Sequence, residues 1–454
     1  MPAYIVVDLG FGDSGKGLLT DFLVRHLNAG VVVRYNGGAQ AGHNVVTSDG
    51  RHHTFSQFGS GTFAPHVKTY LSRHVVIHPT ALLVEGDILK GNGVPNPFSR
   101  LRLSDQALVI TPYHQAANRI RELARGADRN GSCGVGVGEA VEDAMFHTDN
   151  RVLAGDLHQP ELLRRKLHSI REQKHGEMTA LCKESPPDPL ISREMEIFER
   201  QDLVDRWLSS IARITELGLI VSDAVLERWL RETENVILEG AQGILLDADA
   251  GFHPYTTWSR CSSANAFELI KEMAPGTHAY QIGVMRSYAM RHGPGPLPTE
   301  SDDLIPFVSE HNQFNEWQGK VRYGWFDAVL ARYALTVTGK LDSLAVTHMD
   351  VLPRLETWQY CQGYQGFHDT DSLCSGTTFS DDLLTSFRLP NDLSLERREQ
   401  FTQLISGITP MLEACTTSEE TVIQKIELLL GQSVGLISRG PRAGDVQIRS
   451  PLPR

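Results

Sequence analysis

A strand, a glycine-rich turn and a helix follow one another at the start of the chain, and this order constrains the fold more than any other feature. Residues 4–9 (YIVVDL) have the continuous apolar character of a strand buried in a parallel sheet. Residues 18–27 carry apolar side chains at helical spacing. The turn between them, residues 10–17 (GFGDSGKG), nearly matches the P-loop, whose backbone N–H groups and lysine bind phosphate. The chain therefore predicts an α/β fold with a P-loop-like phosphate-binding turn.

One position in this turn departs from the common P-loop. Gly17 stands where Ser or Thr ordinarily offers a hydroxyl to Mg²⁺, so the metal ligand must come from elsewhere. Asp13 lies inside the loop, and a carboxylate there indicates chemistry as well as nucleotide binding. Such a turn can also exist for steric reasons alone, but Lys16 at this spacing favours phosphate binding.

Short runs rich in Val and Ile recur between glycine-containing turns and helical patterns, at residues 31–35, 75–78, 108–111, 236–238, 281–284 and 343–347. This alternation is typical of a large, mostly parallel central sheet with crossover helices. Residues 157–231 are instead charged and helix-forming, and we interpret them as a helical insertion packed on the sheet. We therefore predict one α/β domain over residues 1–454.

Composition narrows the function classes. The formal net charge of −12, with scattered Lys and Arg, argues against a nucleic-acid partner. No apolar stretch reaches eighteen residues and the first residues do not resemble a signal peptide, so we expect a cytoplasmic protein without a membrane partner. The six cysteines lack the short paired spacing of a zinc site or a disulfide framework.

Polar residues follow several of the predicted strands. His43 ends a glycine-rich turn (residues 36–44) that could reach the first loop, although a lone histidine is more often a surface residue. Residues 130–139 contain four glycines and could form an anion-binding nest or a flexible loop. Gln242 and Asp350 also follow strands; Asp350 could read a guanine edge or simply cap a helix.

Together these motifs resemble the adenylosuccinate synthetase family, ligases that join L-aspartate to inosine monophosphate (IMP) at the expense of GTP. Residues 12–17 (GDSGKG) match the family's GDEGKG except at Ser14, and residues 37–43 (GGAQAGH) match GGxNAGH except at Gln40. Further matches are residues 239–243 (EGAQG), 293–300 (GPGPLPTE), 324–327 (GWFD), 350–352 (DVL) and 437–441 (ISRGP). Several motifs in this order are far more specific than any one of them.

The resemblance implies roles for individual residues. Asp13 is implied as the catalytic base, His43 as the catalytic acid and Lys16 as a phosphate ligand, with Mg²⁺ bound by Asp13 and the Gly42 carbonyl. The implied GTP-binding residues are Gly12, Gly15, Lys16, Gly17, Gly42, Arg322, His348, Asp350, Ser438 and Gly440. The implied substrate-binding residues are Gln40, Ser132, Cys133, His147, Gln242, Thr257, Gln318 and Lys320. The family is dimeric, so the resemblance also implies a homodimer.

The departures from the family gather in the substrate-binding positions. Gln40, Cys133 and His147 replace an Asn, a Thr and an Arg lent by the second subunit, whereas Thr257 is kept. The loop that holds aspartate reads WQGKVR at residues 317–322, without the usual threonines. These changes remove donors for carboxylate and phosphate, and the bulky Trp317 would reshape the donor pocket.

We therefore predict a GTP- and Mg²⁺-dependent ligase that phosphorylates the 6-oxo group of an IMP-like nucleotide and replaces it with the amine of L-aspartate. One alternative is a specialised relative with another oxo acceptor or amine donor, including guanine nucleotides. The other is a nucleotide-binding regulatory protein without catalysis. Because His348 replaces the family's lysine, ATP is also possible as the phosphoryl donor.

Overall fold

A ten-stranded sheet forms the centre of the computed structural model, which describes residues 2–184, 186–308, 317–366, 375–380, 383–389 and 394–452. The strand order is β21-β20-β15-β11-β1-β10-β2-β5-β7-β9. All neighbours are parallel except β20 and β21. The strands are β1 (Pro2–Asp8), β2 (Val31–Arg34), β5 (Lys68–Leu71), β7 (Leu101–Ser104), β9 (Ile220–Val221), β10 (Val236–Glu239), β11 (His278–Arg286), β15 (Ser343–Thr347), β20 (Val434–Ser438) and β21 (Val446–Ile448). The predicted large, mostly parallel sheet is confirmed.

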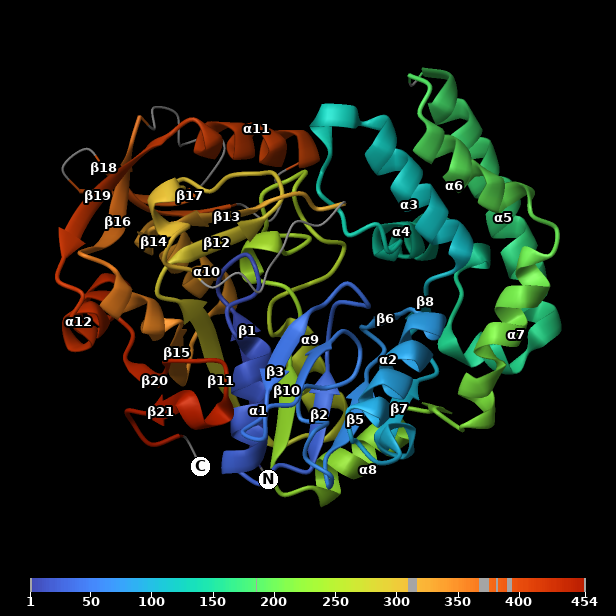
Figure 1. The fold of residues 1–454 in the computed structure, drawn as a ribbon, viewed down its shortest axis with the longest axis horizontal. Coiled ribbons are helices and arrows are strands. Elements are labelled where there is room, and N and C mark those ends of the chain that lie inside the picture. The colour runs from blue at the N-terminus through green and yellow to red at the C-terminus, as the bar shows by residue number, and fades with distance from the viewer. Residues whose placement is uncertain are drawn as a thin grey trace.

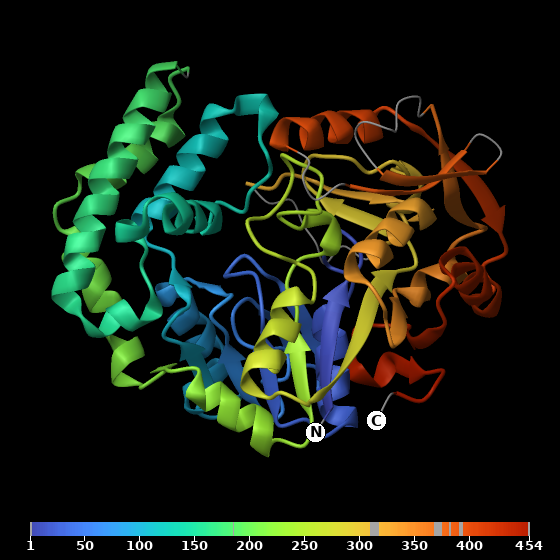
Figure 2. The same ribbon diagram turned by 180° about the vertical axis from the view of Figure 1, so that it is seen from behind.

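Helices cover both faces of this sheet (Figures 1 and 2). Side chains of successive strand residues point to opposite faces, so Ala3 and Ile5 pack with α8 (Ala224–Glu232) and α9 (Ala264–Met273). Tyr4 and Val6 pack with α1 (Lys16–His26) on the other face. Burial on both faces explains why β1 reads as an uninterrupted apolar run.

A second helical region lies beside the sheet, at the right of Figure 1. It contains α2 (Pro79–Gly91), α3 (Pro112–Ala124), α4 (Val137–Phe146), α5 (Pro160–Glu184), α6 (Pro189–Glu199) and α7 (Leu203–Glu216). The predicted insertion supplies α5 to α7, which pack mainly on α3 and α2, and most of α8, which packs on the sheet beside β1. It also supplies β9, which adds an edge strand to the sheet through its pairing with β7.

Two predicted strands do not join the central sheet. Residues 75–78 and 108–111 contain only β6 (Val76–Ile77) and β8 (Leu108–Val109), which pair with each other. Each run stops shortly before a proline, Pro79 or Pro112, that begins a helix. A proline lacks the N–H that a strand needs but suits the first helical turn, so these strands stay short.

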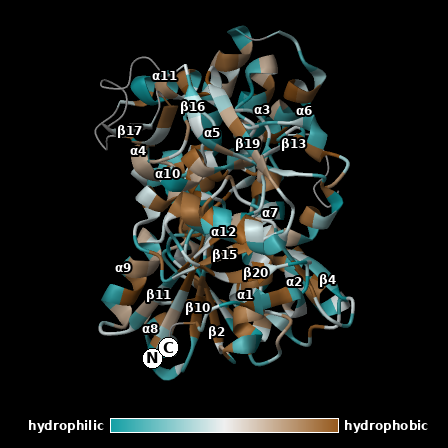
Figure 3. Ribbon diagram, turned by 90° about the vertical axis from the view of Figure 1, so that its left-hand side faces the viewer, coloured by the Kyte–Doolittle hydropathy of each residue, from teal (hydrophilic) through white to brown (hydrophobic). Residues whose placement is uncertain are grey.

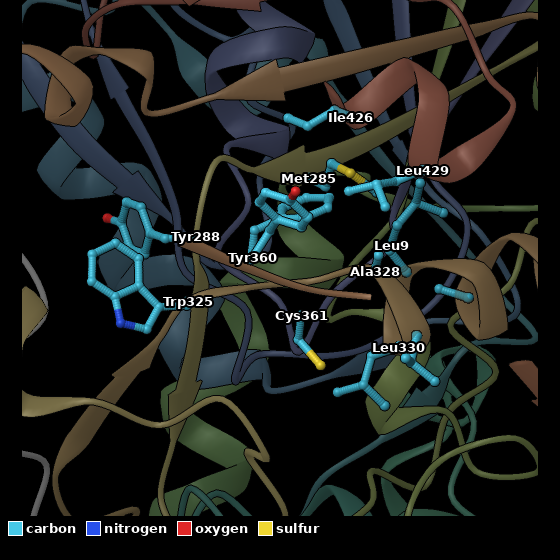
Figure 4. Close-up of a cluster of buried hydrophobic side chains, with 14 of the residues drawn as sticks. Leu9, Met285, Tyr288, Trp325, Ala328, Leu330, Tyr360, Cys361, Ile426 and Leu429 are labelled. Atoms are coloured by element: carbon cyan, nitrogen blue, oxygen red, sulfur yellow. The ribbon is translucent and has the colours of Figure 1, made fainter. Parts of the chain in front are cut away.

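The C-terminal region packs its own sheet against the end of the central one. It consists of β14 (Phe326–Asp327), β16 (Trp358–Gln365), β17 (Ser375–Ser380), β18 (Leu383–Arg388), β19 (Thr409–Cys415), α10 (Ala328–Thr338), α11 (Leu395–Ser406) and α12 (Glu419–Leu430). Figure 4 shows part of the shared core, in which Leu9 and Met285 lie near Tyr360 and Leu429. Two antiparallel strand pairs, β3 (His43–Val46) with β4 (His52–Phe55) and β12 (Ala289–His292) with β13 (Val321–Gly324), lie outside both sheets.

Apolar segments follow the central strands and the inner helices, whereas polar segments lie toward the periphery (Figure 3). Among the helices that the structure describes, none has both the length and the apolar character required to cross a bilayer.

Candidate active site

A cavity of about 1050 Å³ opens at the edge where the parallel strands end, the usual ligand position in α/β folds. The predicted residues that line it are Gly12, Asp13, Lys16, Gln40, Gly42, His43, Ser132, Cys133, Gln242, Thr257 and Gln318. These residues come from six separate stretches of the chain. The fold therefore brings the first loop together with most of the predicted substrate-binding residues.

Asp8, the last residue of β1, organises the phosphate-binding turn. Its carboxylate accepts hydrogen bonds from the backbone N–H groups of Gly10 (2.8 Å) and Ser14 (3.0 Å) and from the Ser14 hydroxyl (2.8 Å). The same carboxylate lies 2.7 Å from the Lys16 ammonium, and both side chains are buried. Gly15 adopts a left-handed conformation (φ 95°), which lets α1 begin at Lys16 directly after the turn. The lysine is therefore held and partly neutralised before any phosphate binds.

The Asp13 side chain lies at the cavity wall in contact with His292. Its backbone is left-handed (φ 53°), and its carbonyl accepts a hydrogen bond from Arg286 (2.8 Å). His292 Nε2 lies 2.8 Å from Asp13 Oδ2. Burial raises the pKa of Asp13, but the hydrogen bond and attraction of His292, with Lys16 and Arg286 behind them, outweigh burial and lower the pKa to about 2. The carboxylate is therefore ionised at neutral pH and able to accept a proton.

His43 forms a buried pair with Glu239, the last residue of β10. His43 Nδ1 lies 2.6 Å from Glu239 Oε1, and Ser60 donates two more hydrogen bonds to this carboxylate. Burial and Arg34 lower the pKa of His43, which Glu239 opposes. Burial raises the pKa of Glu239, but His43, Arg34 and Ser60 together lower it to about 2. The ionised carboxylate directs the Nδ1–H inward and leaves Nε2 as the chemically available nitrogen.

Several buried polar atoms around the cavity have no hydrogen-bond partner among the described residues. They include His43 Nε2, Gln40 Oε1 and both amide atoms of Gln242, which has a left-handed backbone (φ 55°). Buried polar groups are nearly always paired, so unpaired ones around a cavity indicate groups that a ligand pairs. Burial raises the pKa of Cys133 to about 12, so this position offers a thiol and not a thiolate.

The residues predicted to bind the guanine base lie outside this cavity, at the ends of β15 and β20. Because these strands are paired, the turn with His348 and Asp350 lies beside Ser438 and Gly440. Thr347 donates a hydrogen bond to the Ser14 carbonyl (2.8 Å), which connects this end of the sheet to the phosphate-binding turn. Burial lowers the pKa of His348 well below its usual value, so its ring carries no charge at neutral pH. The residues predicted to bind the base thus adjoin the phosphate-binding turn.

Four predicted positions are used differently from the expectation. The Arg322 guanidinium bonds to the Gly293 and Gly295 carbonyls and to Glu300, so it holds the 293–300 turn and does not line the cavity. Lys320 does not line the cavity either, and His147 is exposed at the end of α4. Trp317, which we expected to reshape the donor pocket, packs on Gly134 beneath the Arg119 guanidinium, 5.2 Å from the ring centroid, and does not line the cavity.

The donor groups of the site suit Mg²⁺ that is bound together with a nucleotide. Among the described residues, no group of three or more His, Cys, Asp or Glu side chains could hold a metal ion. Asp13 and the Gly42 carbonyl offer two oxygen ligands at the same cavity. Mg²⁺ needs six oxygen ligands and commonly takes several from phosphates and water. The site therefore fits Mg²⁺ as part of a metal–nucleotide complex.

Sequence reasoning missed the residues behind the reacting groups. Asp8 and Glu239 end otherwise apolar strands, and this charge at a strand end was a signal that we did not use. His292 follows no motif that indicates its contact with Asp13, because it comes from β12, 279 residues away.

Three comparisons with known proteins agree with this geometry. The adenylosuccinate synthetase family model matches residues 5–447. Adenylosuccinate synthetase from Alkalilimnicola ehrlichii is 34% identical over 99% of this chain and 98% of its own length. The enzyme from Pseudomonas syringae pv. syringae is 31% identical over 99% of each chain.

Solved structures share the fold. Fully ligated adenylosuccinate synthetase from Plasmodium falciparum superposes with a TM-score of 0.76 at 19% identity, covering 98% of this chain and 99% of its own. Cyanophage S-2L succinoaminodeoxyadenylate synthetase, bound to dGMP and to dATP as an energy donor, gives a TM-score of 0.58 at 18% identity over 98% and 95% of the two chains. At these identities the likeness concerns the fold alone, and none of the comparisons favours either alternative function.

Proposed function

Because this chain belongs to the adenylosuccinate synthetase family of carbon–nitrogen ligases, we propose that its cavity activates the 6-oxo group of IMP with GTP and joins L-aspartate at C6. The observation that carries this proposal is that the Asp13 carboxylate, the Lys16 ammonium and the His43 imidazole line one cavity. A base, a phosphate cation and an acid are the three groups that phosphorylation of a lactam oxygen requires.

In the first step Asp13 accepts the N1 proton of IMP, and O6 attacks the γ-phosphorus of GTP. The bond from phosphorus to the β,γ-bridging oxygen breaks, which gives GDP and a 6-phosphoryl nucleotide. A carboxylate whose pKa is about 2 is fully ionised before this step. Lys16 and His43, with Glu239 behind it, stabilise the charge on the transferring oxygens. Mg²⁺ bound by Asp13 and the Gly42 carbonyl would neutralise phosphate charge.

In the second step the amine of L-aspartate attacks C6. The C6–O6 bond breaks, phosphate leaves with its electron pair, and the amine nitrogen loses a proton to solvent. We assign Gln40, Ser132, Cys133, Gln242 and Thr257 to the nucleotide, since all five line the cavity. We assign Gln318, which also lines it, to the amine donor.

We further propose that the protein is a cytoplasmic homodimer. His147 occupies the position at which the family resemblance implies a contribution from the second subunit. Met145 and Phe146, which precede it, are 59% and 66% exposed, and Met145 lines the cavity. A second copy that covered these side chains would remove apolar surface from water.

Product analysis tests the proposed reaction. The purified chain is incubated with GTP, Mg²⁺, IMP and L-aspartate, and adenylosuccinate, GDP and phosphate are measured. We expect equal amounts of the three products, and loss of turnover by a factor of at least 10³ in Asp13→Asn with GTP affinity largely retained. GTP binding without phosphate release under any combination of substrates would contradict an enzymatic role, and unchanged turnover in Asp13→Asn would refute the assigned base.

A further inference from the structure

His292 connects the candidate base to the amine-donor side of the cavity. It is the last residue of β12, and its ring lines the cavity with 21% of the side chain exposed. The following residue, Gly293, donates its N–H to the Lys320 carbonyl (3.0 Å) and packs closely on the Gln318 carbonyl. The ring therefore contacts Asp13, and the backbone that carries it contacts the segment assigned to the amine donor.

The two ring nitrogens of His292 have different surroundings. Nε2 lies 2.8 Å from Asp13 Oδ2, which is a hydrogen-bond distance, and in a pair with a carboxylate the ring nitrogen is the donor. Nδ1 is buried and has no hydrogen-bond partner among the described residues. In a neutral ring that donates from Nε2, Nδ1 holds a lone pair and can only accept. A buried acceptor without a partner leaves a place for an N–H group of a ligand.

We propose that His292 is a positioning residue for both half-reactions: Nε2–H orients the Asp13 carboxylate toward the oxo acceptor, and Nδ1 accepts a hydrogen bond from the amine of the donor. This inference rests on the proposed ligase function, which supplies an amine on this side of the cavity. The contact orients the amine beside the carbon that it attacks. It also gives the chain a polar ligand for the donor that neither Lys320 nor Arg322 supplies from its observed position.

Two substitutions separate the two nitrogens. In His292→Gln the amide nitrogen can take the place of Nε2, which keeps the hydrogen bond to Asp13 and removes the Nδ1 acceptor. In His292→Asn the amide oxygen can take the place of Nδ1, which keeps the acceptor and removes the contact with Asp13. His292→Ala removes both. GTP affinity and the midpoint of thermal unfolding, measured for each variant, establish that the protein is folded.

Positional isotope exchange measures the first half-reaction alone. GTP with ¹⁸O in the β,γ-bridge scrambles its label when IMP is phosphorylated reversibly without L-aspartate. We expect His292→Asn to slow this exchange about tenfold or more and to leave the KM of L-aspartate within threefold. His292→Gln should raise that KM about tenfold and slow the exchange much less, and His292→Ala should show both losses.

Succinate, which resembles L-aspartate without the amine, identifies the group that Nδ1 contacts. Its inhibition constant should be the same in His292→Gln and the unmodified protein, because the lost contact is to the amine. A parallel loss of succinate and aspartate affinity would mean that a protonated ring binds a carboxylate, which overturns the proposal. Equal effects of the Gln and Asn variants would assign His292 a structural role. If the unmodified protein shows neither exchange nor turnover, the proposed function itself fails.

Discussion

Replacing Glu239 with Gln tests whether His43 acts with a carboxylate behind it. The substitution keeps the size of the side chain but removes its charge, so the Nδ1–H of His43 loses an ionised acceptor 2.6 Å away. A hydrogen bond to a charged group contributes roughly 1.5–3 kcal/mol, which corresponds to about 10- to 150-fold in rate if it is realised in the transition state. We therefore expect kcat to fall about 100-fold.

The assay is phosphate release at saturating GTP, IMP and L-aspartate, with the KM of GTP measured alongside. Because Glu239 is fully buried behind His43, the KM of GTP should change little and isotope exchange should fall with kcat. Ser60→Ala is the matched control, since it removes one hydrogen bond to the same carboxylate and leaves the charge. The kcat of that variant should fall about fivefold. The pairing argument would be refuted if Glu239→Gln kept kcat within threefold of the unmodified value, or if its kcat fell no more than that of Ser60→Ala.

Three further outcomes follow from the structure. Burial raises the pKa of Asp327 to about 6, so the folded state binds this proton more tightly than the unfolded state does. The stability that comes from this proton is lost as pH rises from about 4 to 6. Asp327→Asn should remove this loss and raise the free energy of unfolding by roughly 1–3 kcal/mol at pH 8, measured by urea unfolding. A Cβ on Gly243 would lie 2.1 Å from the Gly10 carbonyl oxygen, so Gly243→Ala should weaken GTP binding at least tenfold by calorimetry, whereas Gly176→Ala, in open space on α5, should not. Asp350→Asn should abolish a preference for GTP over ATP in the ratio of kcat/KM values, and a preserved ratio would reject Asp350 as the guanine ligand.

The phosphate-binding part of the site could be predicted because local rules determine it. A buried strand, a glycine turn and an amphipathic helix place the backbone N–H groups and Lys16 without help from distant residues. Parallel pairing then brings the ends of β1, β2 and β10 to one edge, which explains why His43 and Gln242 reach the same cavity. The alternation of short strands and helices was enough to predict this part of the fold.

The substrate side was harder because loops determine it. The position of the Trp317 ring depends on Gly134 and Arg119, which provide space and a cation for it and precede it by 183 and 198 residues. The role of Arg322 depended on the carbonyls of the 293–300 turn, whose path no periodicity encodes. The sequence gives the side-chain type at these positions, but only the tertiary structure shows which partner each side chain contacts.

An acidic chain can hold a polyanion because the attraction is local. Lys16 has three N–H donors, and the contact with Asp8 uses one, so two can turn to phosphate while the ion pair persists. This pair also stabilises the buried ammonium when no nucleotide is bound. An unpaired buried charge would destabilise the fold by several kcal/mol. Acidic surface more than a Debye length away, about 10 Å at 0.1 M salt, is screened. The net charge of −12 therefore disfavours the binding of extended polyanions, whose phosphates would cross that surface. It does not oppose the binding of a single nucleotide within the turn.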